Sequence, residues 1–317
     1  MSLAVRRDPA ADPVLLGALS LDVYVGRDLV LPGGGVLNMA WHWRRAGQSF
    51  LLVSRVGDDR PDVFLEFLRR HAIPHRPSIV VAGASASIDI VIRPDLQPHM
   101  DNFVEGVWAD FRATRDEEAA IAVAPGVHLV LVEGAIRELD RLRMAGVVGE
   151  RTVGGEDGAP TGPEVTADFL GFRHYTVERF AATMRAVDLG FVGWPGDAGD
   201  ETVAGIRHVA HMLGRLVVVT LGSRGVQVFD GRPGGIGDAF VPVLPVAVEG
   251  TTVGCGDAFI AAFLASWRRS RDVLTAVEAG KVAGAEATAW RRPLPDDAYG
   301  EAAAMSLRTT DEAAAGA

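Results

Sequence analysis

The fold is decided by the stretch Gly250-Thr251-Thr252-Val253-Gly254-Cys255-Gly256-Asp257, a glycine-rich turn that leads into the apolar run Ala258–Leu264. The first turn of a helix has unsatisfied N–H groups and a partial positive charge, and glycine lets a ligand approach the backbone closely. The turn therefore suits an anion, and Asp257 can direct a carboxylate, a potential general base, to the same spot. On glycine spacing alone, a plain turn in which Asp257 caps the helix explains the pattern equally well.

The turn resembles the second signature of the PfkB carbohydrate kinases, D-T-x-G-A-G-D, at Thr252, Gly254, Gly256 and Asp257. The resemblance implies that Asp257 is the catalytic base, that the amides of Gly254, Cys255 and Gly256 form an anion hole, and that Thr252 lies at the nucleotide. Thr251 stands where the family usually has Asp, in the monovalent-cation and magnesium environment. Activation by a monovalent cation is therefore left open.

A second likeness lies near the N-terminus, where 32–40 resembles the family's G-G-x-x-x-N-x-A and 56–59 resembles its V-G-x-D. A carboxylate and an amide can take paired hydrogen bonds from a diol. Subgroup-like matches to fructoselysine 6-kinases occur at 102–111 and 167–169. The substrate-binding residues that the resemblance implies are Asp22, Gly33, Gly34, Asn38, Glu105 and Asp168.

A third likeness is the stretch 217–226, which resembles the family's V-T-L-G-x-x-G nucleotide strand. It implies that Thr220, Gly222 and Gly225 lie near ATP, and that Ala283 and Ala287 of a late helix form a wall of the adenine pocket. The family's N-x-x-E motif is not evident. Asp200 and Glu201 could hold Mg²⁺, which prefers one or two carboxylates with phosphate oxygens, or could equally complement a helix dipole.

From residue 114 onward, strand and helix patterns alternate, which favours a mostly parallel sheet sandwiched by helices. Paired extended segments in the N-terminal region predict a small additional sheet. The expected strands are 14–19, 23–31, 50–56, 79–81, 87–93, 128–132, 165–169, 189–192, 216–221 and 226–229. The expected helices are 36–46, 60–71, 114–121, 135–145, 176–187, 201–213, 256–269 and 272–290, with a loop at 146–163. Thr114, followed by Glu117, is a capping-box signature at the start of the third helix.

The resemblance implies an α/β, ribokinase-like fold with a small β-sheet lid. We expect one ribokinase-like domain over 14–300, a lid formed by about 20–33 and 79–112, and a frayed tail at 301–317. The apolar residues of the lid suggest a homodimer that packs lid sheets together; the alternative is a monomer whose lid covers its own substrate.

Composition limits the partners. Of the 317 residues, 48% are hydrophobic, and the net charge is −10 (31 basic minus 41 acidic), which argues against nucleic-acid binding. The single cysteine, Cys255, fits a reducing cytoplasm, and we expect neither a secretory signal nor a membrane span.

These observations predict an ATP-dependent sugar kinase that transfers the γ-phosphoryl group of Mg-ATP to a hydroxyl, with a fructosamine such as fructoselysine as one candidate substrate. Two alternatives stay open: a nucleoside kinase of the adenosine type, and a non-catalytic nucleotide or sugar sensor that kept the fold. A dinucleotide-binding dehydrogenase is disfavoured because the G-x-G-x-x-G spacing is absent.

Overall fold

The computed structural model describes residues 11–27, 29–149, 162–172 and 175–300. Within these ranges the chain divides into two units. Unit 1 takes 11–17, 49–53 and 110–245, and unit 2 takes 18–48, 54–109 and 246–300. The tail that we expect to fray, 301–317, and most of the expected loop at 146–163 lie outside the described residues.

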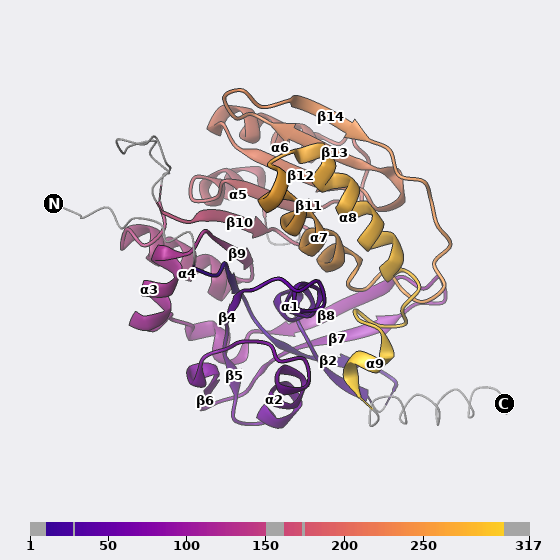
Figure 1. Ribbon diagram of the computed structural model, residues 1–317. Coiled ribbons are helices and arrows are strands. Elements are labelled where there is room, and N and C mark those ends of the chain that lie inside the picture. The colour runs from indigo at the N-terminus through magenta and orange to yellow at the C-terminus, as the bar shows by residue number, and fades with distance from the viewer. Residues whose placement is uncertain (1–10, 28, 150–161, 173–174, 301–317) are drawn as a thin grey trace. The chain divides into compact units, whose positions relative to one another are not determined.

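Unit 1 contains a sheet whose neighbouring strands are largely parallel (Figure 1). Its order is β14 (Gly237–Val241), β13 (Val226–Asp230), β12 (Leu216–Thr220), β11 (Leu189–Gly193), β10 (Glu164–Asp168), β9 (Gly126–Val130), β1 (Val14–Leu16) and β4 (Leu51–Val53). The pairs from β12 to β4 are parallel, whereas β13 and β14 add antiparallel at one edge. Val217, Val218 and Val219 are all fully buried, as expected for a strand covered on both faces.

Helices alternate with the parallel strands of unit 1 and return the chain to the start of the next strand. They are α3 (Arg115–Val123), α4 (Glu133–Met144), α5 (Val177–Met184) and α6 (Glu201–Leu213). Helix α6 packs against β12 and β13, and ends where Gly214 takes the left-handed conformation that favours glycine.

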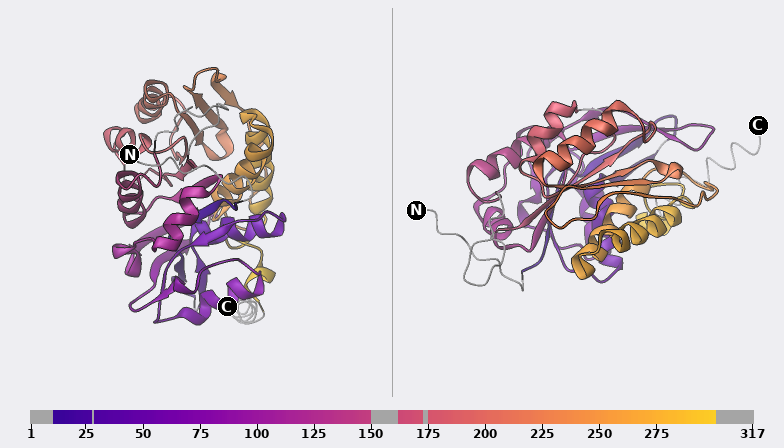
Figure 2. Two further views of the ribbon diagram at one scale, coloured as in Figure 1. Left: turned by 60° about the vertical axis from the view of Figure 1, so that its left-hand side comes forward. Right: turned by 90° about the horizontal axis from the view of Figure 1, so that it is seen from above.

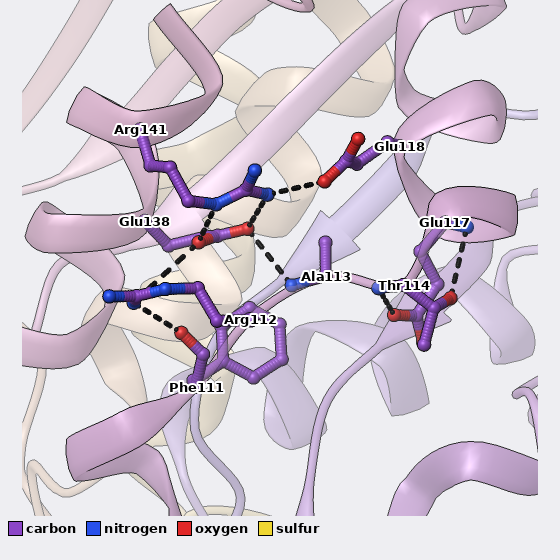
Figure 3. A network of polar contacts seen from close by, with 8 residues as sticks. All are labelled: Phe111, Arg112, Ala113, Thr114, Glu117, Glu118, Glu138 and Arg141. Carbon is purple, nitrogen blue, oxygen red and sulfur yellow. Dashed lines mark hydrogen bonds and ion pairs between the residues drawn. The ribbon is translucent and has the colours of Figure 1, made fainter. Parts of the chain in front are cut away.

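A polar network fixes the segment 111–114 to α3 and α4 (Figure 3). The Glu138 carboxylate, which is fully buried, accepts hydrogen bonds from the Ala113 backbone N–H at 2.9 Å and from Arg141 Nε at 2.7 Å. Arg141 also pairs with Glu118 at 2.7 Å. The capping box expected from Thr114 and Glu117 is confirmed, so both ends of this short segment are held by side-chain hydrogen bonds.

Unit 2 contains the smaller sheet, with the order β3 (Leu29–Gly33), β2 (Ser20–Tyr24), β7 (Ala86–Ile92) and β8 (Pro98–Val104). The single extended stretch expected over 23–31 is wrong, because a turn with Gly26 at φ +79° divides it into β2 and β3. A short parallel pair, β5 (Val56–Gly57) and β6 (Val80–Val81), lies in the same unit. The strand expected over 50–56 is also divided, because β4 joins the large sheet and β5 does not.

The helices of unit 2 are α1 (Gly35–Arg45), α2 (Pro61–Arg70), α7 (Cys255–Ser270), α8 (Val273–Ala287) and α9 (Asp296–Tyr299). Helices α7 and α8 run side by side in every view (Figures 1 and 2). Helix α1 packs on α7, where Trp43 Nε1 donates a hydrogen bond to the carbonyl oxygen of Ala261 at 2.9 Å. This packing joins two segments of the chain that are more than two hundred residues apart, and it places the start of α1 beside the start of α7.

The expected fold class is confirmed: a large, mostly parallel sheet with helices, and a small separate sheet. Strands β8 and β14 and helix α9 were not predicted. Among the helices in the described ranges, none combines the length and apolar character needed to cross a membrane.

Candidate active site

Asn38 and Asp257, which the sequence analysis singled out separately, are in direct contact. Asn38 lies in the first turns of α1 and Asp257 in the first turn of α7. Asn38 Nδ2 donates a hydrogen bond to Asp257 Oδ2 at 2.7 Å, a length typical of a charged acceptor. The other amide atom, Asn38 Oδ1, is buried and has no hydrogen-bond partner among the described residues. An unsatisfied acceptor beside a carboxylate is suited to receive a hydroxyl group of a ligand.

Asp22, on β2, adds a second carboxylate to this site. Its side chain is buried, and Oδ1 accepts a hydrogen bond from Ser20 Oγ at 2.9 Å. Gly33, on the neighbouring strand β3, pairs with Ser20 and has to lack a side chain, because a Cβ there would lie 2.2 Å from the Asp22 carboxylate. Gly34 is at φ +99°, and a Cβ there would lie 2.5 Å from the Ala18 carbonyl oxygen. The glycine pair thus provides clearance for Asp22 and for the turn into α1.

The two carboxyl groups have raised pKa values. Burial raises the pKa of Asp22 to about 7, the hydrogen bond from Ser20 opposes the shift, and the charge of Asp257 raises it further. Burial raises the pKa of Asp257 to about 6, and the hydrogen bond from Asn38 opposes the shift. Near neutral pH, Asp257 is mostly ionised while Asp22 is divided between its two forms. A carboxylate with a pKa close to neutral is well matched to accept a proton.

The N-terminus of α7 has no side-chain cap among the described residues, although the Cys255 N–H donates a long hydrogen bond of 3.4 Å to the Thr252 carbonyl oxygen. Gly254 precedes the helix at φ +79°, a conformation that favours glycine, and a Cβ there would lie 2.6 Å from Pro293. Both the backbone conformation and the lack of space therefore require glycine. A Cβ on Gly256 would meet no atom within 4 Å, which shows open space at the first turn. The first-turn amides can therefore bind an anion beside Asp257.

Cys255 contributes its backbone to this turn rather than a reactive thiol. The side chain is half-buried, and burial together with the charge of Asp257 raises the pKa of the thiol to about 12. The thiol therefore stays protonated at neutral pH, in the manner of a packed cysteine.

Thr251 explains one departure from the family's signature. Its side chain is buried, and its hydroxyl donates a hydrogen bond to the Leu96 carbonyl oxygen at 3.2 Å and accepts one from the Val253 N–H. Next to it, Thr252 Oγ1 donates to Gln97 at 2.9 Å. The tip of the β7–β8 hairpin is thus hydrogen-bonded to the turn that precedes α7. An aspartate at 251 would face a carbonyl oxygen, so the hydroxyl suits this contact better. Sequence reasoning missed Leu96 and Gln97, since no local pattern marks a hairpin tip that contacts a distant loop.

Helix α8 approaches the same turn through its glycines. A Cβ on Gly284 would lie 3.3 Å from the Cys255 carbonyl oxygen, and one on Gly280 would lie 2.8 Å from the Phe259 ring. Ala283 and Ala287, which the resemblance assigns to an adenine wall, are on this helix; the first is half-buried and the second buried. Gly280 and Gly284 were missed, although their four-residue spacing on a helix is a signal of close packing.

Six further candidates belong to unit 1, and four of them lie at one edge of its sheet. Asp168 ends β10, Thr220 ends β12 and Gly222 follows it; Asp200 closes the loop after β11. Because β10, β11 and β12 are parallel neighbours, these residues gather at the carboxyl ends of the strands, where ligands bind in open α/β sheets. The Asp168 carboxylate accepts a hydrogen bond from the Leu170 N–H at 2.8 Å. Gly225 is required mainly by packing, since a Cβ there would lie 2.6 Å from the Phe240 ring.

Asp200 and Glu201 stand side by side at the start of α6. Asp200 Oδ2 accepts hydrogen bonds from Trp194 Nε1 and from the Asp197 N–H, both at 2.9 Å, whereas Glu201 is exposed. In the part of the chain that the structure describes, no group of three or more metal-binding side chains is present. The pair fits Mg²⁺ as that ion usually binds, through one or two carboxylates with the other positions left to phosphate and water.

Glu105 directly follows β8 in unit 2 and is half-buried. Its carbonyl oxygen accepts a hydrogen bond from the Trp108 N–H. A contact between Glu105 and a substrate stays a prediction.

Comparison with known proteins shows similarity to kinases. Residues 188–290 match the family model described as "pfkB family carbohydrate kinase". The chain is 26% identical over 284 residues to the cytidine kinase of Thermococcus kodakarensis, covering 85% of this chain and 93% of that one. It is 24% identical over 275 residues to the fructoselysine 6-kinase of Escherichia coli, covering 86% and 95%.

The fold has a close counterpart among solved structures. The ribokinase of Giardia lamblia superimposes with a TM-score of 0.70 at 15% sequence identity, covering 95% of this chain and 99% of that one. The fold of this chain is thus ribokinase-like. Both curated relatives are small-molecule kinases, so the chain is similar to carbohydrate and nucleoside kinases of the PfkB type.

Proposed function

We propose that the protein transfers the γ-phosphoryl group of Mg-ATP to a hydroxyl of a sugar or sugar derivative, with Asp257 as general base. The observation that carries the proposal is the hydrogen bond of 2.7 Å from Asn38 to Asp257 at the uncapped start of α7. It orients a carboxylate of raised pKa beside amides that can hold an anion.

In this reaction Asp257 accepts the proton of the attacking hydroxyl as the new O–P bond forms and the bond to the leaving ADP oxygen breaks. The amides of Gly254, Cys255 and Gly256 stabilise charge on the transferring group. Each donor of this kind typically contributes about 3–4 kcal/mol to lowering the barrier. Asn38 holds the carboxylate in place, and its free Oδ1 together with Asp22 is suited to bind neighbouring hydroxyls of the substrate.

We assign the nucleotide to the carboxyl edge of the unit 1 sheet. Thr220, Gly222 and Gly225 follow the pattern of a nucleotide strand. In unit 2, Thr252, Ala283 and Ala287 stay predictions from the resemblance. Asp200 and Glu201 would hold Mg²⁺, which when bound to ATP neutralises charge on the phosphates. Thr251 is neutral, so this position provides no negative charge for a monovalent cation. Activation by such a cation is a separate question.

The acceptor is assigned to the unit 2 residues Asp22, Gly33, Gly34, Asn38 and Glu105, and Asp168 of unit 1 stays a prediction from the resemblance. The similarity to a fructoselysine 6-kinase supports a ketose or fructosamine. The similarity to a cytidine kinase supports the alternative that the acceptor is a nucleoside, whose ribose presents the same kind of diol. The two readings share the base and the anion hole and differ only in the substrate.

The deciding experiment measures ADP release with Mg-ATP against ketoses, fructosamines, aldonates and nucleosides. Turnover on a ketose or fructosamine alone is expected. Turnover on nucleosides alone would replace the sugar-kinase proposal with its alternative. No turnover, together with a rise in Tm on adding ATP, would favour a non-catalytic sensor.

The pH dependence tests the base directly. Because Asp257 has to be ionised to accept a proton and its pKa is about 6, kcat/KM should fall by about tenfold per pH unit below that value. In Asn38→Ala the hydrogen bond that lowers the pKa of Asp257 is lost, so the acid limb should move to higher pH. A limb that stays in place in this variant would show that a different group titrates.

The small sheet is proposed as a lid that includes the segments about 20–33 and 79–112, within a ribokinase-like domain over 14–300. Val25, Val91, Phe103 and Val104 on or beside its strands are exposed, with Val104 at 55%. Such a face favours a homodimer through the lid sheet. A reducing, cytoplasmic location is supported by the single cysteine, Cys255.

A further inference from the structure

A pocket of about 300 Å³ opens in unit 2 at the end of α1 opposite to Asn38. It is lined by Trp41, Arg44 and Arg45 from α1, by His71 after α2, and by Asp297 and Ala298 from α9. None of these residues belongs to the site described above. The pocket therefore offers a second place where a small molecule could bind to the same unit.

The walls of this pocket are held together without a ligand. His71 Nε2 donates a hydrogen bond to the Ala298 carbonyl oxygen at 2.8 Å, and the His71 carbonyl oxygen accepts one from Arg44 Nε at 3.3 Å. The His71 ring also packs on Phe67, with ring centroids 4.5 Å apart, and meets the Trp41 ring edge-on at 6.4 Å. Three separate segments are thus joined at His71, so the pocket is largely formed before anything binds.

The charge of the pocket indicates an anion. The Arg45 guanidinium lies 5.2 Å from the centre of the Trp41 ring, a stacked position that orients its N–H groups. Arg44 and Arg45 are both exposed, and in the part of the chain that the structure describes neither forms an ion pair. Two neighbouring guanidinium groups without acidic partners match the oxygens of one phosphate group, which arginine binds through paired N–H groups.

The acidic residue in the pocket restricts which groups, besides the phosphate, the ligand can have. Asp297 would repel a second negative group, but its carboxylate can accept hydrogen bonds from hydroxyls. We infer that this pocket binds a small hydroxylated phosphate monoester, in the chemical class of a sugar phosphate, at a site separate from Asn38 and Asp257. This inference does not depend on the proposed reaction, although the product of that reaction belongs to the same chemical class.

The test is calorimetric titration of the full chain with glucose 6-phosphate, glucose and inorganic phosphate as probes. Glucose 6-phosphate should bind, glucose should not, and inorganic phosphate should bind at least tenfold more weakly than glucose 6-phosphate. In the double variant Arg44→Gln/Arg45→Gln, affinity for glucose 6-phosphate should fall at least tenfold.

Two matched variants separate the pocket from other sites. Arg69→Gln removes one exposed positive charge from α2 outside the pocket and should leave the affinity unchanged. Asp22→Asn alters the candidate active site and should also leave it unchanged, because the pocket lies elsewhere. An unchanged affinity in the double arginine variant would overturn the inference, as would loss of binding in Asp22→Asn. Equal affinity for inorganic phosphate and glucose 6-phosphate would show a nonselective anion patch and overturn it too.

Discussion

Replacing Asp257 with asparagine should lower kcat by roughly 10²–10⁴-fold, the usual contribution of a general base. Asparagine has the size of aspartate and can still accept the hydrogen bond from Asn38, but it cannot take the hydroxyl proton. The stability of the variant, by contrast, should not fall. The pKa of Asp257 is raised to about 6 by burial, so its ionised form is held in the fold at a cost above that pH. At neutral pH the variant should therefore unfold at the same Tm or a higher one.

This pairing of lost activity with retained stability separates a catalytic role from a structural one. The matched control is Asp116→Asn, which makes the same change in the exposed first turn of α3. It should keep full turnover and lose only a little stability through the helix dipole. The measurements are steady-state ADP release and thermal unfolding on the same preparations. Retention of more than about a tenth of the wild-type kcat in Asp257→Asn is incompatible with a base worth at least two orders of magnitude.

Replacing Glu138 with alanine should lower the free energy of unfolding by about 3–5 kcal/mol, the range for breaking a buried ion pair. The Glu138 carboxylate is fully buried and serves both Arg141 and the Ala113 N–H (Figure 3). Its loss leaves a half-buried guanidinium with Glu118 alone and removes the acceptor of a buried backbone donor. Urea unfolding measured by circular dichroism gives the difference.

A surface pair provides the control for this second prediction. Glu66 and Arg70 form an exposed ion pair one turn apart on α2, and Glu66→Ala should cost no more than about 0.5 kcal/mol. In the double variant Glu138→Ala/Arg141→Ala the unpaired charge is gone, so part of the loss should be recovered. If Glu138→Ala proved as mild as Glu66→Ala, the network would not hold the segment 111–114 in place.

Several elements could be predicted from the sequence because their signals are local. Helix α6 has the bounds that the pattern predicted, 201–213, since Gly214 ends it in the left-handed conformation. The capping box at Thr114 could also be predicted, because its two residues are only three positions apart. Strands β8 and β14 were missed because they lie at sheet edges and carry exposed polar residues, so they lack a buried run. The hairpin within 23–31 was not predicted, because Gly26 is the only residue that marks its turn.

The candidate site was predicted in part, and for a different reason. Asn38 and Asp257 are 219 residues apart, and only likeness to a family connected them before the structure showed their hydrogen bond. The contact of Thr251 with Leu96 could not be predicted, because it depends on where a hairpin tip packs and not on any pattern in either segment. The raised pKa values of Asp22 and Asp257 could not be predicted either. They follow from the burial of each side chain, whereas the sequence indicates only how often a residue type is buried on average.

The division of the chain between the two units also has a consequence during protein synthesis. Every strand of the unit 1 sheet has been made once Val241 is added, whereas unit 2 needs α7, which begins at Cys255. Until then α1, made near the beginning, lacks the helix on which Trp43 and its apolar neighbours pack. A nascent chain therefore exposes that apolar surface for most of its synthesis. Exposed apolar surface of this kind binds chaperones or aggregates. The pair Asn38–Asp257 can form only as the final stretch emerges, so a chain released before residue 257 lacks this contact.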